Sequence, residues 1–523
     1  MARNEREKKK TSTLLNRFTT LRNQRRVWEA HWQEIGDYIV PRKADITRKR
    51  TDGDKRTEKI YDGTAIHAAE LLTASLHGML TSASMPWFSL RFTDPMLATD
   101  DVAKEWLEGA EETMYNAFAR SNFQEQIHEL YADLVTFGTA VMMISSDEDT
   151  QLRFSTRHIA ECYLSEDEHG RVDTVVRKYQ IPGRDARTLW GDDIGPRLLQ
   201  RIEKDPYEMV DLLNFVQPRD ERDTGLPDNL NMPWMSCYID PEDEWLIAES
   251  GFDEFPFVCP RFLKASFEQG YGRSPSMTAL PDIKMLVPDD GFVLPVRVTP
   301  GGLNFYRSGT RDRIEPLMTG ANTPLGLKIE DQRREAIRQA FYVDQLMLRE
   351  SPNMTATEVI ARNEEKMRLL GPVLGRLQAE MLQPLITRCF NLLAKQRVFA
   401  PAPEYLQTGN IDIEYVSPLA KAQRQGELNS TLRMFEILNP LMQIDPSVFD
   451  YLDMDGLVQF VTRTVGVPAS VLRADGEVRR MREERAKAQA QQEQMAQVTQ
   501  AAEAAGAAAP ALKAVGGLAG PRQ

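Results

Sequence analysis

Apolar residues recur at alternating steps of four and three over the first forty positions of the chain, which is the spacing of one face of an α-helix. Arg25 fills the one position where this series lacks an apolar residue, and Pro41 ends the helix expected over residues 12–40. The series is too short for a coiled coil and contains tryptophan, so we expect the helix to pack on its own domain. Its members are Leu14, Phe18, Leu21, Trp28, Trp32, Ile35 and Ile39.

Helices dominate up to residue 139 and short strands dominate after it. The further helices are expected over residues 64–82, 101–119 and 123–137. A helical insert near 184–215 interrupts the strands. Together these patterns predict an α+β, mainly helical fold. The strand candidates are rich in β-branched and aromatic residues, and they are residues 140–144, 152–156, 172–180, 234–240, 244–250 and 257–263.

Turn-rich and helical segments make up the rest of the chain. Residues 288–320 are strand-like, with a tight turn at Pro300-Gly301-Gly302, and a helix is expected from about Lys328 to Leu348. A longer helix is expected from Thr355 to Lys395, because its first residues follow the T-x-x-E capping-box pattern.

The long helix should bend. It contains Gly371-Pro372 and Pro384, and a proline inside a helix removes a hydrogen bond and clashes with the preceding turn. Helices are expected again over residues 419–466 and 478–500, and the last residues, to 523, are low in complexity.

Composition and charge narrow the class of protein. A chain of 523 residues with 42% hydrophobic and 27% charged residues is typical of a globular protein of two to four units. No apolar run is long enough to cross a membrane, and no apolar segment follows the basic N-terminus as a secretory signal would require. The formal net charge of −13 disfavours sequence-specific DNA binding and is compatible with a channel wall along which DNA slides.

The charged linker over residues 42–58 leaves two interpretations open. Its basic residues fit a nucleic-acid contact, and they fit a solvated loop equally well.

The sequence lacks the motifs of catalysis and metal binding. There is no phosphate-binding G-x-x-x-x-G-K-[ST] loop, no H-E-x-x-H and no G-x-S-x-G, and the six histidines are scattered. The four cysteines, none in C-x-x-C spacing, are expected to be isolated thiols in a reducing compartment. Acidic clusters at 147–149, 166–168 and 242–244 are expected to be solvated turns. We therefore expect that the protein has no catalytic residue, binds no metal or cofactor, and is not an enzyme.

Several short motifs, in this order and spacing, resemble those of podovirus portal proteins, the head-to-tail connectors of short-tailed (T7-like) bacteriophages. They cover nearly the whole chain, and no single one is decisive. The motifs are Trp28 to Pro41, Tyr61-Asp62-Gly63-Thr64-Ala65 with Pro86-Trp87-Phe88, Gly270 to Pro275 with Ala279 to Ile283, Asn353 to Val359 with Gln383 to Ile386, and Gly466-Val467-Pro468.

The resemblance implies a portal fold with wing, stem, clip and crown, in a ring of twelve copies around a central channel. The parts would be residues 1–275 (wing), 276–287 (first stem helix), 288–325 (clip), 326–348 (second stem helix), 349–355 (tunnel loop), 356–418 (long kinked wing helix and return strand), 419–490 (crown) and 491–523 (tail).

The resemblance also implies a function and partners. The ring would sit at one capsid vertex, at the head–tail junction of the virion, after assembly in the host cytoplasm. It would conduct double-stranded DNA without sequence specificity during packaging, retention and ejection. The partners would be the terminase large subunit and then the tail adaptor, the major capsid and scaffold proteins, and no membrane. The alternative is another virion structural protein, such as a head–tail adaptor or a scaffold.

Candidate site residues follow from this layout. The clip candidates could equally be solvated side chains. Arg349 could touch phosphate, or it could pair with Glu350 or a neighbouring copy. The stem candidates could line the pore or bridge adjacent copies. The candidates are Arg349, Glu350, Ser351 and Asn353 in the channel loop, Lys328, Arg333, Arg334 and Arg338 on the stem, and Arg307, Arg311, Asp312, Arg313 and Glu315 in the clip, where terminase and adaptor would dock.

One departure from the family concerns the first stem helix. It should match the second in length, yet Lys284-Met285-Leu286 runs directly into Val287-Pro288, which leaves it about ten residues. Either this stem differs from the family's, or a stretch is missing between Leu286 and Val287, which is the interpretation we favour.

Overall fold

The computed structural model of the chain describes most of the first 403 residues. Left out of this part are residues 265–269, 286–322, 347–369, 227 and scattered positions among 49–99; after 403 only short pieces between 433 and 488 are described. The chain divides into two compact units, of which the larger comprises residues 1–91, 109–402 and 411–420 and the smaller residues 92–108, 403–410 and 421–523. The elements below belong to the larger unit, except the first residues of α3.

A five-stranded antiparallel sheet forms the centre of the larger unit, with the order β3-β4-β5-β6-β7. The side chains of its central strand alternate between the two faces, as the period of a strand requires. Val210 and Leu212 lie in one apolar cluster, and Leu213 and Phe215 lie in another. The strands are β3 (Cys162–Glu166), β4 (Val172–Pro182), β5 (Met209–Pro218), β6 (Trp234–Asp240) and β7 (Trp245–Phe252).

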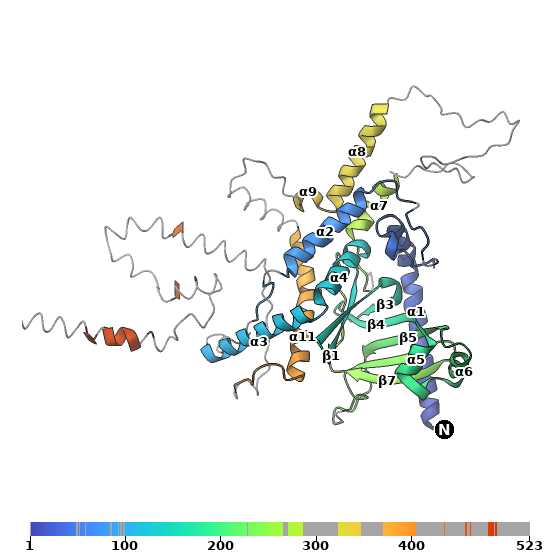
Figure 1. Cartoon of the computed structure of the whole chain (residues 1–523), viewed down its shortest axis with the longest axis horizontal. Helices are drawn as coiled ribbons and strands as arrows, with labels where there is room; N and C mark the ends of the chain where they lie inside the picture. The colour runs from blue at the N-terminus through green and yellow to red at the C-terminus, as the bar shows by residue number, and fades with distance from the viewer. Residues whose placement is uncertain are drawn as a thin grey trace, which may run out of the picture. The chain divides into compact units, whose positions relative to one another are not determined.

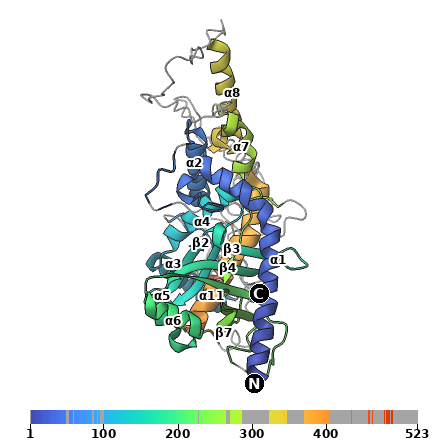
Figure 2. The ribbon, with the colours of Figure 1, turned by 90° about the vertical axis from the view of Figure 1, so that its right-hand side faces the viewer.

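Helices cover both faces of this sheet. Helix α1 (Ala2–Tyr38) packs Leu14 and Leu21 on one face, and α5 (Gly183–Trp190) and α6 (Pro196–Lys204) cover the other. Figure 2 shows α1 on one side of the strands and α5 and α6 on the opposite side. This part of the unit is therefore a three-layer arrangement of helix, sheet and helices.

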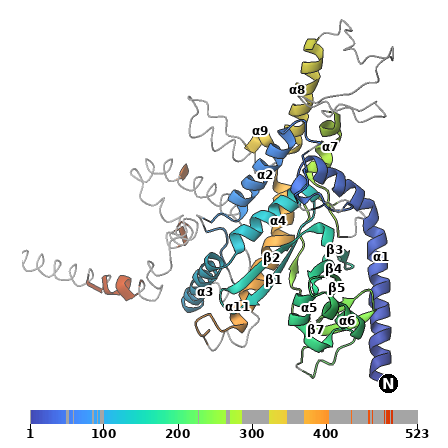
Figure 3. The same ribbon diagram turned by 45° about the vertical axis from the view of Figure 1, so that its right-hand side comes forward.

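The remaining described elements form a helical part beside a small second sheet of order β2-β1-β8 (Figures 1 and 3). The strands are β1 (Val141–Asp147), β2 (Gln151–Arg157) and β8 (Phe257–Val258). The helices are α2 (Thr64–Leu80), α3 (Asp101–Arg120), α4 (Phe123–Phe137), α7 (Pro275–Met285), α8 (Thr323–Ala340), α9 (Val343–Leu346) and α11 (Gln383–Lys395), and the short 3-10 turns are η1 (Pro41–Lys43), η2 (Ile159–Glu161) and η3 (Gly191–Asp193).

The apolar stripe of α1 is confirmed. Five of its seven members are buried, and Phe18 and Trp28 are half-buried. Arg25, the interruption in the series, is also buried. The helix begins about ten residues earlier than expected, because residues 2–11 are helix-forming but have no apolar period to reveal them.

Three secondary-structure predictions were wrong. The helical insert near 184–215 ends at Lys204, and the following residues form β5, the central strand of the sheet. The single strand expected over 257–263 is only Phe257–Val258, because Pro260 cannot donate to a ladder. The helix expected from Lys328 to Leu348 begins at Thr323 and is interrupted at Tyr342, whose φ is +59°.

The long helix is irregular where its second proline lies. Residues 370–377 are helical, η4 (Gln378–Leu382) is a π-helical turn, and α11 continues to Lys395. Pro384 has no amide hydrogen for the carbonyl of Glu380, and the amide of Gln383 instead reaches five residues back to Gln378. A widened turn therefore precedes Pro384, where a bend was expected. The part of this helix before residue 370 lies outside the described residues.

Candidate functional site

The helical hairpin of α7 and α8 is the structural feature that the sequence singled out as a stem. The two helices pack against each other and against α2, and α7 also packs against α4. Ile283 of α7 and Ile337 of α8 are buried there. Figures 1 and 3 show α8 leading away from α2. The segment that joins α7 to α8, residues 286–322, lies outside the described residues.

One carboxylate connects α2 to α8. Asp62 Oδ1 accepts the amide hydrogen of Thr64 at 2.8 Å, which satisfies a donor at the start of α2, and Asp62 Oδ2 accepts from Arg334 Nε at 2.9 Å. Burial alone would raise the pKa of Asp62, but the hydrogen bonds from Thr64 and the charge of Arg334 outweigh it, so the pKa lies below its usual value. The motif Tyr61-Asp62-Gly63-Thr64 therefore holds the base of α8.

The four candidate residues on the stem differ in their surroundings. Arg334 contacts Asp62 and also Asp331 and Glu330, at 3.2 and 3.7 Å, and Arg338 lies 3.7 Å from Glu335. Lys328 is exposed and Arg333 is half-buried. Acidic neighbours thus balance two of the four basic residues, Arg334 and Arg338. The candidates of the channel loop (Arg349, Glu350, Ser351, Asn353) and of the clip (Arg307, Arg311, Asp312, Arg313, Glu315) lie outside the described residues.

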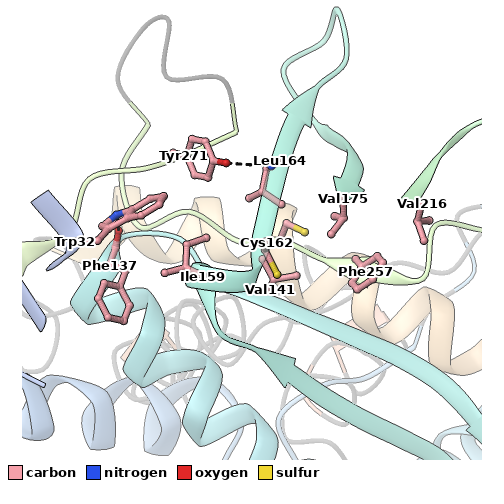
Figure 4. Close-up of a cluster of buried hydrophobic side chains, with 11 residues drawn as sticks. Trp32, Phe137, Val141, Ile159, Cys162, Leu164, Val175, Val216, Phe257 and Tyr271 are labelled. Atoms are coloured by element: carbon pink, nitrogen blue, oxygen red, sulfur yellow. Dashed lines mark hydrogen bonds between the residues drawn. The ribbon is translucent and has the colours of Figure 1, made fainter. Parts of the chain in front are cut away.

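Two of the sequence motifs meet in space on the other side of α7. Tyr271 is buried against Trp28 and Trp32, with ring centroids 5.9 and 5.1 Å away. Its hydroxyl accepts the amide hydrogen of Leu164 at 3.1 Å, as Figure 4 shows beside Trp32. Trp32 Nε1 donates to the carbonyl of Phe137 at 3.2 Å. The W-x-x-x-W and G-Y-G motifs are therefore two halves of one apolar cluster that joins α1, α4 and β3.

The segment that follows Tyr271 fastens the start of α7 to the end of α4. Ser274 and Ser276 donate their hydroxyl hydrogens to the carbonyls of Thr136 and Val135, at 2.8 and 3.0 Å. Gly138, with φ +79°, comes so close to Gly272 that a Cβ atom would lie 2.3 Å from the carbonyl oxygen of Gly272. These contacts fix where the hairpin leaves the body of the unit.

A buried cluster of charges joins three distant segments. Arg261 donates from Nε and Nη2 to the two carboxylate oxygens of Glu380, at 3.0 and 2.7 Å, and from Nη1 to Glu166. Glu166 also accepts from Lys264 at 2.7 Å, and Arg376 reaches Glu380 at 3.2 Å. The cluster ties the β3–β4 turn and the segment after β8 to the π-helical turn of the long helix.

This cluster changes the interpretation of one acidic turn. Glu166 was expected in a solvated turn, and it is instead largely buried in ion pairs. Asp167 does form a turn, where its Oδ1 accepts the amide hydrogens of His169 and Arg171. Sequence reasoning missed Glu166 and Glu380 because their partners are about one hundred residues away.

The structure also brings together two histidines. His77 of α2 and His128 of α4 have Nδ1 atoms 3.3 Å apart, and His77 Nε2 lies 2.8 Å from Gln124 Oε1. They are 51 positions apart, so spacing gave no signal. Among the described residues, no group of three or more histidine, cysteine, aspartate or glutamate side chains could hold a metal ion.

Two basic residues of the linker are paired with carboxylates of the same chain, and so is Lys59, which follows the linker. Lys43 reaches Asp133 at 2.7 Å, Arg56 reaches Asp45 at 2.7 Å, and Lys59 reaches Asp37 at 2.6 Å. Neither of the two interpretations left open for residues 42–58 fits Lys43 and Arg56, because both are paired with carboxylates. Both interpretations stay open for Arg42, Arg48 and Lys55, which are exposed. None of the described helices could span a membrane.

Comparison with known proteins gives matches along nearly the whole chain. A family model described as "Bacteriophage head to tail connecting protein" matches residues 11–290 and 284–472. The "Probable portal protein" of Bordetella phage BPP-1 is 31% identical over 518 residues, which cover 92% of this chain and 92% of that protein. The "Portal protein" of Salmonella phage epsilon15 is 32% identical over 523 residues, which cover 94% and 93%.

Proposed function

The chain belongs to the bacteriophage head-to-tail connecting proteins, the portal proteins of phage heads, and from this premise we propose that twelve copies close into a ring around a DNA channel. It is a structural component of the virion at the head–tail junction. The observation that carries the proposal is the family match over residues 11–472, combined with a helical hairpin whose base Asp62 and Arg334 hold in place.

In this proposal the parts of the chain have separate mechanical tasks. Residues 1–275 form the wing, 276–287 and 326–348 the two stem helices, 288–325 the clip, 349–355 the tunnel loop, 356–418 the long wing helix and return strand, and 419–490 the crown. Double-stranded DNA passes through the channel without sequence specificity. The terminase large subunit docks on the clip during packaging and the tail adaptor replaces it afterwards, while the major capsid and scaffold proteins contact the ring during assembly in the host cytoplasm.

The candidate residues keep their proposed roles within this scheme. The channel loop with Arg349, Glu350, Ser351 and Asn353 faces DNA, and Arg307, Arg311, Asp312, Arg313 and Glu315 meet the docking partners. On the stem, Lys328 and Arg333 are the better candidates for contact with DNA or a neighbouring copy, because Arg334 and Arg338 have carboxylate partners in their own chain.

The short first stem helix supports the proposal that residues are missing between Leu286 and Val287. Among the described residues α7 has 11 and α8 has 18, and residues 286–322, which join them, lie outside those described. The family model matches in two segments, 11–290 and 284–472, so the match is broken around this position, where the segments overlap. An intact mass of the natural protein larger than that of the 523 residues would support the proposal, and an equal mass would show that the stem itself is short.

Cryo-electron microscopy of the purified chain, with no symmetry imposed, tests the function. We expect closed rings with a central hole, and neither ATP hydrolysis nor nuclease activity, because translocation is driven by a separate ATPase. Particles without a hole or of indefinite size would favour the alternative of a scaffold or head–tail adaptor. Cleavage of DNA by the purified chain would contradict the proposal that the protein is not an enzyme.

A further inference from the structure

The three-layer part of the larger unit has two different outer faces that point in opposite directions. One is the outer face of α1 and the other is the outer face of the α5–α6 layer, with the five-stranded sheet between them (Figure 2). A ring made of identical copies needs a heterologous contact, in which two different surfaces of one chain meet on neighbouring copies. The arrangement of the layers supplies two such surfaces.

The outer face of α1 is basic. From Lys8 to Trp28 the chain has seven basic residues and no acidic one, although its net charge is −13. Three of the seven are engaged within the chain: Lys10 with Glu249, Arg17 with Ser165, and Arg25 in the core. The other four are exposed and make no ion pair within the described part of the chain; they are Lys8, Lys9, Arg22 and Arg26.

The α5–α6 layer has the opposite charge. Residues 183–208 and 242–244 together contain nine acidic and five basic residues. Four of the arginines are matched inside the layer: Arg184 by Asp185, Arg187 by Glu203, Arg197 by Asp243, and Arg201 by Glu208 and Glu242. Asp192 and Asp193 of η3 are exposed, and their carboxylates make no ion pair with any residue that the structure describes.

Apolar side chains are exposed on both surfaces. Leu189 and Tyr207 of the α5–α6 layer are 66% and 69% exposed, and Val27 of α1 is 80% exposed. Large apolar side chains within a charged rim are typical of protein–protein contacts. Phosphate would complement the charge of α1, but it offers no counterpart to these side chains. The observations therefore favour a second copy of the chain over nucleic acid as the partner.

We propose that the outer face of α1 in one copy docks on the α5–α6 layer of the next copy, with Arg22 and Arg26 opposite the carboxylates of Asp192 and Asp193. The proposal rests on the proposed ring function and names the surfaces through which the ring closes. The contact is partly electrostatic, so it should weaken as the salt concentration rises.

A charge-reversal experiment on the full chain tests this contact by native mass spectrometry. Arg22→Glu with Arg26→Glu should lower the fraction of chains in rings by about tenfold at physiological salt, because two attractive contacts become repulsive in every interface. Adding Asp192→Lys with Asp193→Lys should restore the rings. The control, Arg120→Glu with Arg153→Glu, reverses two exposed arginines outside both surfaces and should leave the rings unchanged.

The outcomes separate the interface from the function. If the wild-type chain forms no ring, the proposed function fails. If the wild type and every variant form rings equally well, the function stands and this interface is wrong. If the α1 variant keeps its rings but loses binding to a short DNA duplex at low salt, α1 is a nucleic-acid surface and the proposal is overturned. The last outcome is that the α1 variant loses its rings with unchanged unfolding, and that the added Asp192→Lys and Asp193→Lys do not restore them. The partner of α1 would then be a surface other than η3, which also overturns the proposed pairing.

Discussion

The guanidinium carbon of Arg25 lies 3.7 Å from the centroid of the Tyr163 ring, at the one position where the apolar series of α1 is interrupted. Arg25 Nη1 also donates to the carbonyls of Ile159 and Cys162, at 3.0 and 2.7 Å, and its Nη2 donates to Glu29. An arginine thus takes the place of an apolar residue because its planar side chain packs on an aromatic ring while its hydrogens satisfy buried carbonyls.

Arg25→Lys should lower the free energy of unfolding by about 2 kcal/mol, because one ammonium group cannot stack on Tyr163 and also reach both carbonyls. Urea unfolding followed by tryptophan fluorescence measures this change. The control is Arg26→Lys, which changes an exposed residue on the same helix and should alter stability by less than about 0.5 kcal/mol. Equal effects for the two substitutions would contradict the proposed role of Arg25.

Glu380→Gln should destabilise the larger unit by about 3 kcal/mol, because it leaves the buried charge of Arg261 with one carboxylate partner fewer. Hydrogen exchange should increase most over residues 370–395 and 259–264, which the pair joins. Lys395→Gln is the matched control on the same helix. The ion pair of Lys395 with Asp253 is exposed, so its loss should lower the free energy of unfolding by less than about 1 kcal/mol. A uniform increase in exchange across the chain would argue against a local connection.

Asp62→Asn should loosen α8 from α2 and make residues 328–340 exchange amide hydrogens faster at neutral pH. The pKa of Asp62 is lowered in the folded chain, so its contribution to stability is present at neutral pH and is lost as the pH falls through the lowered value. The difference in unfolding temperature between wild type and Asp62→Asn should therefore shrink on acidification. Glu330→Gln, which changes a more exposed partner of Arg334, should have little effect.

The four cysteines should not react with a thiol reagent at pH 8 in the folded chain. All four are free and buried, and burial raises the pKa of Cys162 and of Cys237 to about 12. Because the thiolate is the reactive form, labelling should wait for unfolding, when four thiols become available. Ser12→Cys on the exposed face of α1 is a positive control that should react at once. Rapid labelling of a native thiol would contradict the packing of the sheet.

Gly138→Ala should lower the free energy of unfolding by about 3 kcal/mol or more. The alanine would have to adopt a positive φ, and its Cβ would overlap the carbonyl of Gly272. Gly78→Ala is the matched control: Gly78 lies in α2 with open space around it, so the substitution should stabilise by up to about 1 kcal/mol. Thermal unfolding of both variants tests the pair. A harmless Gly138→Ala would mean that the approach of α4 to the Gly270–Pro275 segment is loose.

Local patterns predicted much of the fold of the larger unit. The apolar stripe of α1 was predicted correctly, and helices α2, α3 and α4 matched their expected ranges closely, since period and helix-ending residues are local signals. Strand β5 was missed because a short apolar run directly after a charged helix does not distinguish a buried strand from a continuation of the helix.

The contacts of the candidate site were harder to predict from the sequence than the helices and strands. The motifs that pointed to the family turned out to be contacts between distant segments: Tyr271 with Trp28 and Trp32, and Asp62 with Arg334. A single sequence cannot reveal such pairs, because each member looks like an ordinary aromatic or charged residue. The predictions for the channel loop and the clip stay predictions, since they concern residues outside those described.

Strand β3 lies at the margin of the five-stranded sheet, and two of its outward main-chain groups are already taken: Arg25 binds the carbonyl of Cys162, and the hydroxyl of Tyr271 binds the amide of Leu164. A strand from another chain would have to displace both side chains to add itself there. This protection of the edge strand disfavours amyloid-like polymerisation of copies before they assemble. It matters most at high concentration, as in an infected cell producing capsids.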